Sequence, residues 1–209
     1  MTDANKTLIA ALLDRSGSMS LIKTDTEGGF NNLIAEQRKQ PGEVLVTLMQ
    51  FDDIYETVYS NKPIGEVPSL VLAPRSMTAL LDSIGKGISD IGTGLAALPE
   101  DERPGTVIFL IMTDGMENAS REWTLESVKA KVTEQQQKFG WEFIFLGANM
   151  DAVEVAKGMG ISLDSALTYS ASSAGVTNTV AAASTYITRT RGGERAAFTD
   201  ADRSAAQKN

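Results

Sequence analysis

A chain of 209 residues in which 42% are apolar and 22% are charged can bury a substantial core, and we expect one domain. Its 19 Lys and Arg residues against 27 Asp and Glu give a net charge of -8, which argues against a nucleic acid partner. The absence of cysteine and histidine excludes disulfides, thiolate or imidazole metal ligands, and Cys-His or Ser-His-Asp catalysis.

The first elements predicted along the chain are a strand and a helix. The apolar run Leu8–Leu13 has strand length, follows a polar start and is too short for the apolar core of a signal peptide. A helix is expected within Met19–Gln40, although Gly28 and Gly29 interrupt it. No stretch approaches the roughly 18 to 20 apolar residues of a membrane span, so we expect a cytoplasmic protein that does not enter a membrane.

A hairpin is predicted next. The apolar run Val44–Phe51 and the β-rich segment Ile54–Tyr59 are separated only by Asp52 and Asp53, which we interpret as a turn. So short a connection predicts an antiparallel pair, which we place at one edge of the sheet.

The remaining elements alternate between helix and strand. The clearest helix is Ala79–Leu98, where Leu and Ile recur at steps of three and four residues. A capping pattern at Asp151 predicts a short helix that Gly158 or Gly160 ends. The other expected elements are the strand Thr106–Met112, the helix Leu125–Phe139, the strand Phe143–Leu146 and the helix Ala174–Arg189.

This alternation predicts an α/β fold with a central, mostly parallel sheet, one antiparallel edge strand and helices on both faces. We place a single domain at residues 1–190. The small, polar segment 191–209 is either a loose tail or a docked terminal turn.

Three polar segments are predicted to meet at the carboxyl edge of this sheet. Asp14, Ser16 and Ser18 form a D-x-S-x-S pattern directly after the first strand. Asp114 comes just after the third apolar strand, and Thr78 directly precedes the clearest helix. Because loops at the carboxyl ends of parallel strands form the ligand crevice of such sheets, we expect these five residues to converge.

The five side chains offer two carboxylates and three hydroxyls. Such an oxygen-only set suits a hard cation, so we expect Mg²⁺, with Mn²⁺ or Ca²⁺ as alternatives, rather than zinc. Each residue taken alone is also explained as a helix cap or a turn residue. Their convergence from three loops favours a metal site.

The three segments together resemble the metal-ion-dependent adhesion site (MIDAS) of the von Willebrand factor A (vWA) family. The D-x-S-x-S pattern, the loop threonine and the T-D-G aspartate occur in the family's order, and the order of strands and helices agrees over about residues 7–160. The resemblance implies a Rossmann-like vWA fold that binds one divalent cation. It further implies direct or nearly direct ligation by the hydroxyls, with one or both aspartates acting through water. An Asp or Glu of a partner protein would complete the shell.

The sequence departs from the family pattern in the threonine loop, where Met77 stands at a position that is often glycine. Arg15 occupies a variable position of the first motif and could face the ligand or the solvent. The segments GWEFIFLGAN and ALTYSASSAG look like the carboxyl half of small stand-alone members from bacteria and bacteriophages.

We therefore expect a non-enzymatic protein-binding module of undetermined oligomeric state. One alternative is a structural subunit of a larger assembly, of phage or stress-response type, in which the metal only stiffens the edge loops. Another is a Mg²⁺-dependent phosphohydrolase of the haloacid dehalogenase type, although that family normally has Asp or Thr where this chain has Ser16. Glu117 and Asn118, one turn past Asp114, could orient a water or a ligand but are more often solvated loop residues.

Overall fold

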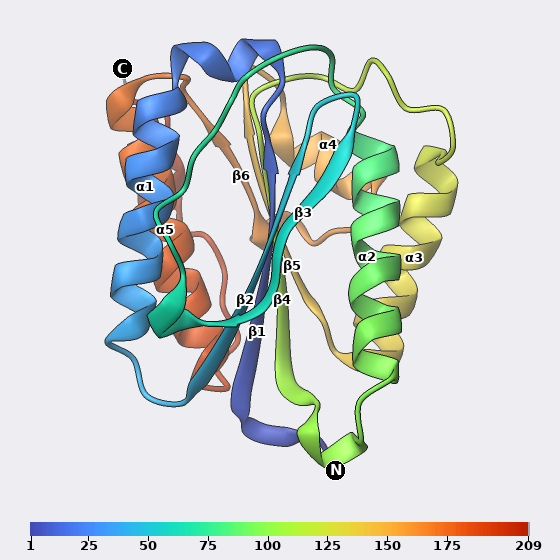
Figure 1. Cartoon of the computed structure of the whole chain (residues 1–209). Helices are drawn as coiled ribbons and strands as arrows, with labels where there is room; N and C mark the ends of the chain where they lie inside the picture. The colour runs from blue at the N-terminus through green and yellow to red at the C-terminus, as the bar shows by residue number, and fades with distance from the viewer. Residues whose placement is uncertain (209) are drawn as a thin grey trace.

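A six-stranded sheet forms the centre of the structure, a computed structural model that describes residues 1–208 (Figure 1). Its strands lie in the order β3-β2-β1-β4-β5-β6. All neighbours pair in parallel except β2 and β3, which form the antiparallel edge hairpin. The strands are β1 (Asp3–Asp14), β2 (Glu43–Phe51), β3 (Tyr55–Pro63), β4 (Pro104–Thr113), β5 (Glu142–Ala148) and β6 (Ala166–Tyr169). The predicted fold class is confirmed.

Helices cover both faces of the sheet (Figure 1). One face carries α1 (Lys23–Arg38) and α5 (Ser173–Arg191), which pack against each other, and α6 (Asp200–Ala206) lies beside α5. The other face carries α2 (Leu80–Ala96), α3 (Leu125–Phe139) and α4 (Ala152–Gly158). Short 3-10 turns are η1 (Gly17–Leu21), η2 (Ile64–Glu66), η3 (Glu100–Glu102) and η4 (Leu163–Ser165). Among the described residues, none of the helices combines the length and the apolar character that crossing a membrane would need.

The central strand β1 divides two hydrophobic cores. Leu8 and Leu12 belong to the core beneath α2 and α3, whereas Ile9 and Leu13 belong to the core beneath α1 and α5. All four side chains are buried, because successive residues of a strand point to opposite faces and both faces here are covered. This explains why β1 is a continuous apolar run.

Helix α1 continues through its two glycines. A Cβ atom at Gly29 would lie 2.9 Å from Cγ2 of Val180, so this glycine allows α1 to approach α5 closely. A Cβ atom at Gly28 would meet no atom within 4 Å. Packing therefore requires glycine at position 29 but not at position 28.

Substitution of these glycines provides a matched test of the α1–α5 contact. Gly28→Ala is expected to raise the free energy of unfolding by about 0.5–1 kcal/mol, because alanine loses less backbone entropy in a helix. Gly29→Ala should lose that gain, since its methyl group pushes against Val180. Urea unfolding of the two variants measures the difference. Equal stabilisation by both would show that the helices do not pack as closely as described.

The segment 191–208 contacts the rest of the domain. The ring of Phe198 packs on that of Tyr186 with centroids 5.1 Å apart, and Ala206 has no exposed surface. Between the two alternatives left open by the sequence, these contacts correspond to a docked segment; Asn209 lies outside the described residues.

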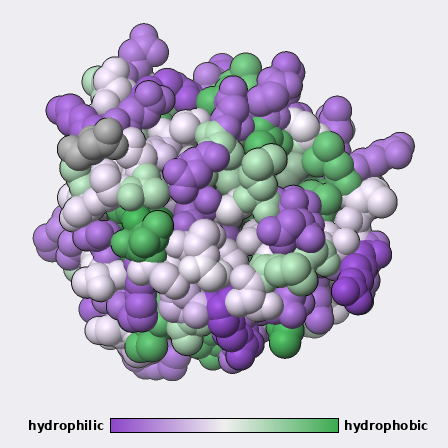
Figure 2. Space-filling view, turned by 90° about the horizontal axis from the view of Figure 1, so that it is seen from above, coloured by the Kyte–Doolittle hydropathy of each residue, from purple (hydrophilic) through white to green (hydrophobic). Residues whose placement is uncertain are grey.

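The carboxyl ends of the parallel strands lie at the top of Figure 1, and Figure 2 looks down on this edge. Its surface is mostly hydrophilic, with separate hydrophobic groups among the polar ones. The predicted polar segments all reach this edge.

Candidate metal centre

Asp14 anchors the site at the end of the central strand. Leu13 pairs with Met112 in the β1–β4 register, so Asp14 and Thr113 end adjacent strands side by side. The Asp14 carboxylate is fully buried. Its Oδ2 accepts a hydrogen bond of 2.6 Å from Thr113 Oγ1, and its Oδ1 accepts one of 2.6 Å from the backbone N–H of Ser16. Both oxygens are thus held in place, and Thr113, the threonine of the T-D-G pattern, is a supporting residue to which the sequence analysis assigned no role.

The two serines of the first loop lie between the two aspartates. Ser18 Oγ donates a hydrogen bond of 2.7 Å to Asp114 Oδ1. Ser16 Oγ lies 3.2 Å from Ser18 Oγ. Four of the five predicted residues therefore form one connected group at the ends of β1 and β4.

The fifth residue, Thr78, also belongs to this group, because its hydroxyl lies close to Gly115 and to the two serines. A Cβ atom built on Gly115 would lie 3.0 Å from Thr78 Oγ1, 3.4 Å from Ser18 Oγ and 3.6 Å from Ser16 Oγ. Three hydroxyl oxygens from two different loops thus surround one small space, which any side chain at this position would occupy. The predicted convergence is therefore present in the structure.

The donor set fits a hard divalent cation. Two carboxylates balance the charge of such an ion, and neutral hydroxyls supply further oxygen ligands. Within residues 1–208 no three acidic, histidine or cysteine side chains gather in a group that could hold a metal. A cation at this edge would therefore be held by the hydroxyls together with the two carboxylates. Asp14, Ser16, Ser18, Thr78 and Asp114 are the residues that would hold it.

Both carboxylates of the group have pKa values above the ordinary value for aspartate. Burial raises the pKa of Asp14 to about 6, an effect that the hydrogen bonds from Thr113 and Ser16 oppose and the charge of Asp114 reinforces. Burial also raises the pKa of Asp114, against the hydrogen bond from Ser18. Because a buried negative charge lacks solvation, a bound cation would stabilise the ionised form of both groups.

The loop that carries Thr78 is fastened on both sides. Ser76 has a positive φ of 61° and its carbonyl accepts from the N–H of Gly17 at 3.1 Å. Asn118 Oδ1 accepts from the N–H of Thr78 at 2.9 Å, and the Asn118 N–H donates to the Thr78 carbonyl at 3.0 Å. Met77 is not among the residues with positive φ, so its backbone conformation does not require the glycine that is often found there.

Glu117 and Asn118 serve the loops rather than a ligand. Glu117 Oε2 accepts from the N–H of Leu81 at 2.9 Å in the first turn of α2, and Oε1 accepts from the N–H of Ser120 at 2.7 Å. Such bonds satisfy backbone donors that a helix start leaves without partners. Both residues are therefore engaged in hydrogen bonds within the loops, a role that neither expectation for this pair included.

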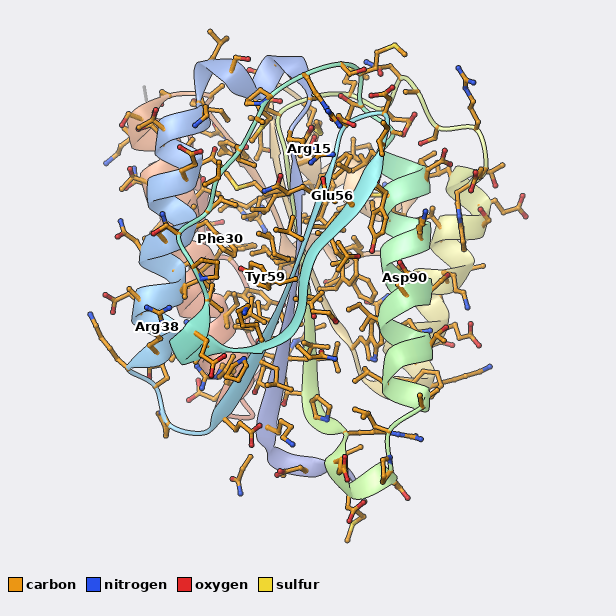
Figure 3. All side chains as sticks on the ribbon, in the orientation of Figure 1. Arg15, Phe30, Arg38, Glu56, Tyr59 and Asp90 are labelled. Atoms are coloured by element: carbon orange, nitrogen blue, oxygen red, sulfur yellow. The ribbon has the colours of Figure 1, made fainter. Side chains whose placement is uncertain are left out.

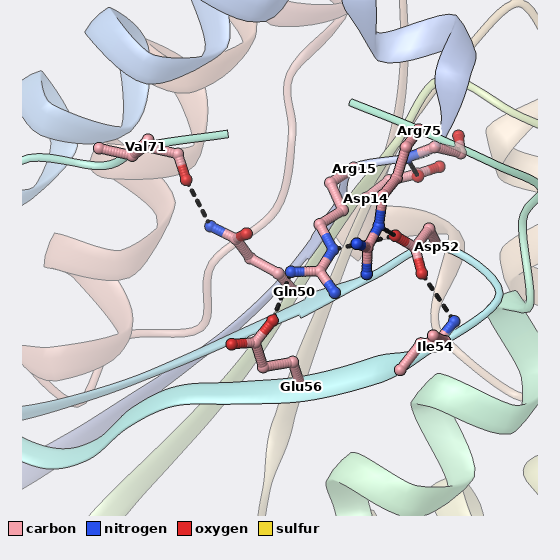
Figure 4. A network of polar contacts seen from close by, with 9 residues as sticks. Asp14, Arg15, Gln50, Asp52, Ile54, Glu56, Val71 and Arg75 are labelled. Carbon is pink, nitrogen blue, oxygen red and sulfur yellow. Dashed lines mark hydrogen bonds and ion pairs between the residues drawn. The ribbon is translucent and has the colours of Figure 1, made fainter. Parts of the chain in front are cut away.

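A buried ion-pair hub beside the site corrects two expectations (Figures 3 and 4). Asp52 has no exposed surface, and its Oδ2 accepts from Arg15 Nε at 3.2 Å and from Arg75 Nε at 2.6 Å. Its Oδ1 accepts from the N–H of Ile54, and Arg15 also pairs with Glu56. Arg15 thus faces neither ligand nor solvent, and Asp52 is more than a turn residue. It connects the first loop to the threonine loop.

The pKa of Asp52 lies below its ordinary value. Burial alone would raise it, but the hydrogen bonds from Arg75 and the N–H of Ile54, together with the charges of Arg15 and Arg75, outweigh that effect. Asp52 is therefore a stable anion, in contrast to Asp14. No sequence pattern indicates this hub, because its partners come from three separated segments.

Comparison with known proteins gives a fold and no close relative. No protein-family model matches the chain, and no curated protein matches it by sequence. Among solved structures, proximal thread matrix protein 1 of the mussel byssus, solved with zinc in its MIDAS motif, matches 87% of this chain with a TM-score of 0.60 and 16% identity. A von Willebrand factor type A protein from Catenulispora acidiphila matches 87% with a TM-score of 0.55 and 12% identity. The pilus adhesin SpaC from Lactobacillus rhamnosus GG matches 88% with a TM-score of 0.57 and 14% identity.

These likenesses show that the chain has a von Willebrand factor A fold. The chain spans less than half the length of these structures, since it covers 46%, 42% and 31% of them respectively. The neighbour with zinc in its motif makes a divalent cation plausible for this fold without fixing which one. The expectation of Mg²⁺ rather than zinc, and that of a bacterial or bacteriophage type, stay predictions.

Proposed function

We propose that this von Willebrand factor A fold is a non-enzymatic, metal-dependent protein-binding module. In it, Asp14, Ser16, Ser18, Thr78 and Asp114 hold a divalent cation, expected to be Mg²⁺, which ligates an Asp or Glu of a partner protein. The observation that supports this most directly is the convergence of three hydroxyls on the space above Gly115, flanked by two carboxylates. This group lies at the sheet edge where open α/β sheets bind ligands.

The composition of the donor set suits this role. Two carboxylates neutralise a doubly charged ion, and hydroxyl ligands add no further negative charge. An incoming carboxylate therefore still gains a strong interaction with the ion. A site built from four or five acidic groups would repel such a ligand instead.

The hydrolase alternative receives less support from the same geometry. A nucleophilic aspartate must be in contact with the phosphorus atom of its substrate, whereas the Asp14 side chain has no exposed surface. The alternative of a structural subunit differs from the proposal in one measurable respect. A stabilising metal would raise the melting temperature without changing the affinity for a partner.

The proposal is tested by capture of partners from the source organism in the presence of Mg²⁺. The intact chain should retain a protein that EDTA releases, and an Asp14→Ala bait should retain none of it. An Asp53→Ala bait is the matched control, because it removes an exposed acid from the same edge. Retention of the same partner in EDTA, or by the Asp14→Ala bait, would refute the proposal.

A further inference from the structure

Two exposed methionines flank the candidate metal centre. The side chains of Met77 and Met116 are 50% and 70% exposed. Four other methionines of the chain are buried in the cores, namely Met19, Met49, Met112 and Met159. Exposed methionine is therefore concentrated at this site, apart from the residue that begins the chain.

The two methionines lie next to candidate ligand residues on two loops that meet. Met77 directly precedes Thr78, and Met116 directly follows Gly115. The Thr78 hydroxyl lies 3.0 Å from the Cβ position of Gly115, so the two loops meet at the residues beside these methionines. Leu21, in the turn η1 that follows Ser18, is 85% exposed and adds a third apolar side chain at this edge.

These residues, Leu21, Met77 and Met116, are called the apolar rim here, because each lies on one of the three loops that carry the candidate ligands and is exposed. Figure 2 views this edge directly, where hydrophobic residues interrupt a mostly hydrophilic surface. Methionine adapts its shape to different apolar partners and is common at binding surfaces. An exposed apolar rim gains free energy only when a partner covers it.

Charge restricts the kind of partner further. The chain has a net charge of -8, so a strongly acidic segment would be repelled by the molecule as a whole. A segment with a single carboxylate is repelled less than one with several, and the attraction of the cation for that carboxylate offsets the repulsion. Apolar neighbours of that carboxylate would then cover the rim.

We infer that the partner segment carries one isolated carboxylate between apolar side chains, which pack on Leu21, Met77 and Met116. This inference rests on the proposed function, because it assigns the sequence context of the carboxylate that reaches the cation. It excludes polyacidic segments and segments whose acid lies among polar residues.

Two capped synthetic peptides test the inference, one with a single aspartate between leucines and one with serines in place of the leucines. With methyl-labelled methionine and Mg²⁺, NMR titration should show the Met77 and Met116 signals shifting on addition of the leucine peptide. Its affinity should exceed that of the serine peptide by about tenfold, from burial of apolar surface. EDTA should abolish binding of both peptides.

Substitutions test whether the apolar rim causes the higher affinity for the leucine peptide. The double change Met77→Ser and Met116→Ser should reduce the preference for the leucine peptide to about twofold or less, with the Mg²⁺ affinity unchanged. Phe139→Ser is the matched control, because Phe139 is an exposed apolar residue at the end of α3, near the opposite edge of the sheet. It should leave both peptide affinities unaltered.

The possible failures are distinguishable. Equal affinities for the two peptides, or a preference that survives in the double variant, would overturn this inference while leaving the proposed function intact. Absence of Mg²⁺ binding by calorimetry would overturn the proposed function itself. Self-association of the chain in Mg²⁺, measured by sedimentation and lost in the double variant, would assign the rim to a second copy instead and overturn the inference.

Discussion

Asp14→Asn is expected to weaken Mg²⁺ binding by about 100-fold or more, because it removes one of the only two negative charges in the donor set. The change is nearly isosteric. The amide oxygen can still accept from the N–H of Ser16. The Thr113 hydroxyl, which now donates to Asp14, lies 3.1 Å from the Gly115 carbonyl and can donate there while accepting from the new amide. Calorimetric titration with Mg²⁺ measures the loss.

The same variant should be more stable than the parent protein when metal is absent. Burial raises the pKa of Asp14 from 3.8 to about 6, so the folded state holds this proton more tightly than the unfolded state does. Its contribution to stability is therefore complete below about pH 4 and is lost as the pH rises through about 6. At about pH 7.5 in EDTA, Asp14→Asn should gain on the order of 2 kcal/mol in free energy of unfolding.

Asp53→Asn provides the control for both measurements. Asp53 is exposed at the same edge, so its replacement changes the net charge equally without touching the site. We expect its Mg²⁺ affinity to stay within about twofold of the parent value, because exposed charges are screened. Parent-like Mg²⁺ binding in Asp14→Asn would show that Asp14 is no part of the metal centre.

Much of the fold was predictable from the sequence because the central strands are buried on both faces. Strands β1, β2, β4 and β5 are apolar runs with clear ends, and the stripe of Leu and Ile in α2 repeats at helical spacing. Strand β6 and helix α6 were missed. They have four and seven residues, which is too short for a period to emerge.

The candidate site was predictable for a different reason. Asp14, Ser16, Ser18, Thr78 and Asp114 each lie directly beside a predicted strand or helix, so topology alone brings them to one edge. The residues that hold them in place were not predictable in this way. Thr113 belongs to the end of an apolar strand, and Asn118 lies in an irregular loop whose path depends on the fold.

The most important feature that the sequence did not predict is the burial of Asp52. An aspartate in an exposed turn and a buried, paired aspartate cannot be distinguished from the local sequence. An aspartate between two strands normally suits a turn. Here the chain reversal places it instead against arginines that lie 37 residues before and 23 residues after it. Its importance follows from burial, and burial depends on Arg15 and Arg75 reaching it from other loops.

Asp52→Ala is therefore expected to lower the free energy of unfolding by about 3–5 kcal/mol, the cost of leaving a buried charge without its partner. Arg15 would keep only the exposed Glu56, and the N–H of Ile54 would lose its acceptor. Because Asp52 has a lowered pKa, its contribution is present above the ordinary aspartate range and is lost as the pH falls through its folded-state value. Urea unfolding at neutral pH measures the loss.

Two further variants distinguish the contribution of the buried Arg15–Asp52 pair from that of the more exposed Arg75–Asp52 pair. Arg75→Ala should cost about 1 kcal/mol or less, because its side chain is 57% exposed and solvent screens its charge. Adding Arg15→Met to Asp52→Ala should recover part of the stability, since an apolar side chain replaces a guanidinium that has lost its buried partner. If Asp52→Ala alone cost no more than Arg75→Ala, the hub would contribute no more than a surface ion pair. The alignment of the first loop with the threonine loop would then depend on their backbone hydrogen bonds, Gly17 to Ser76 and Arg75 to Arg15.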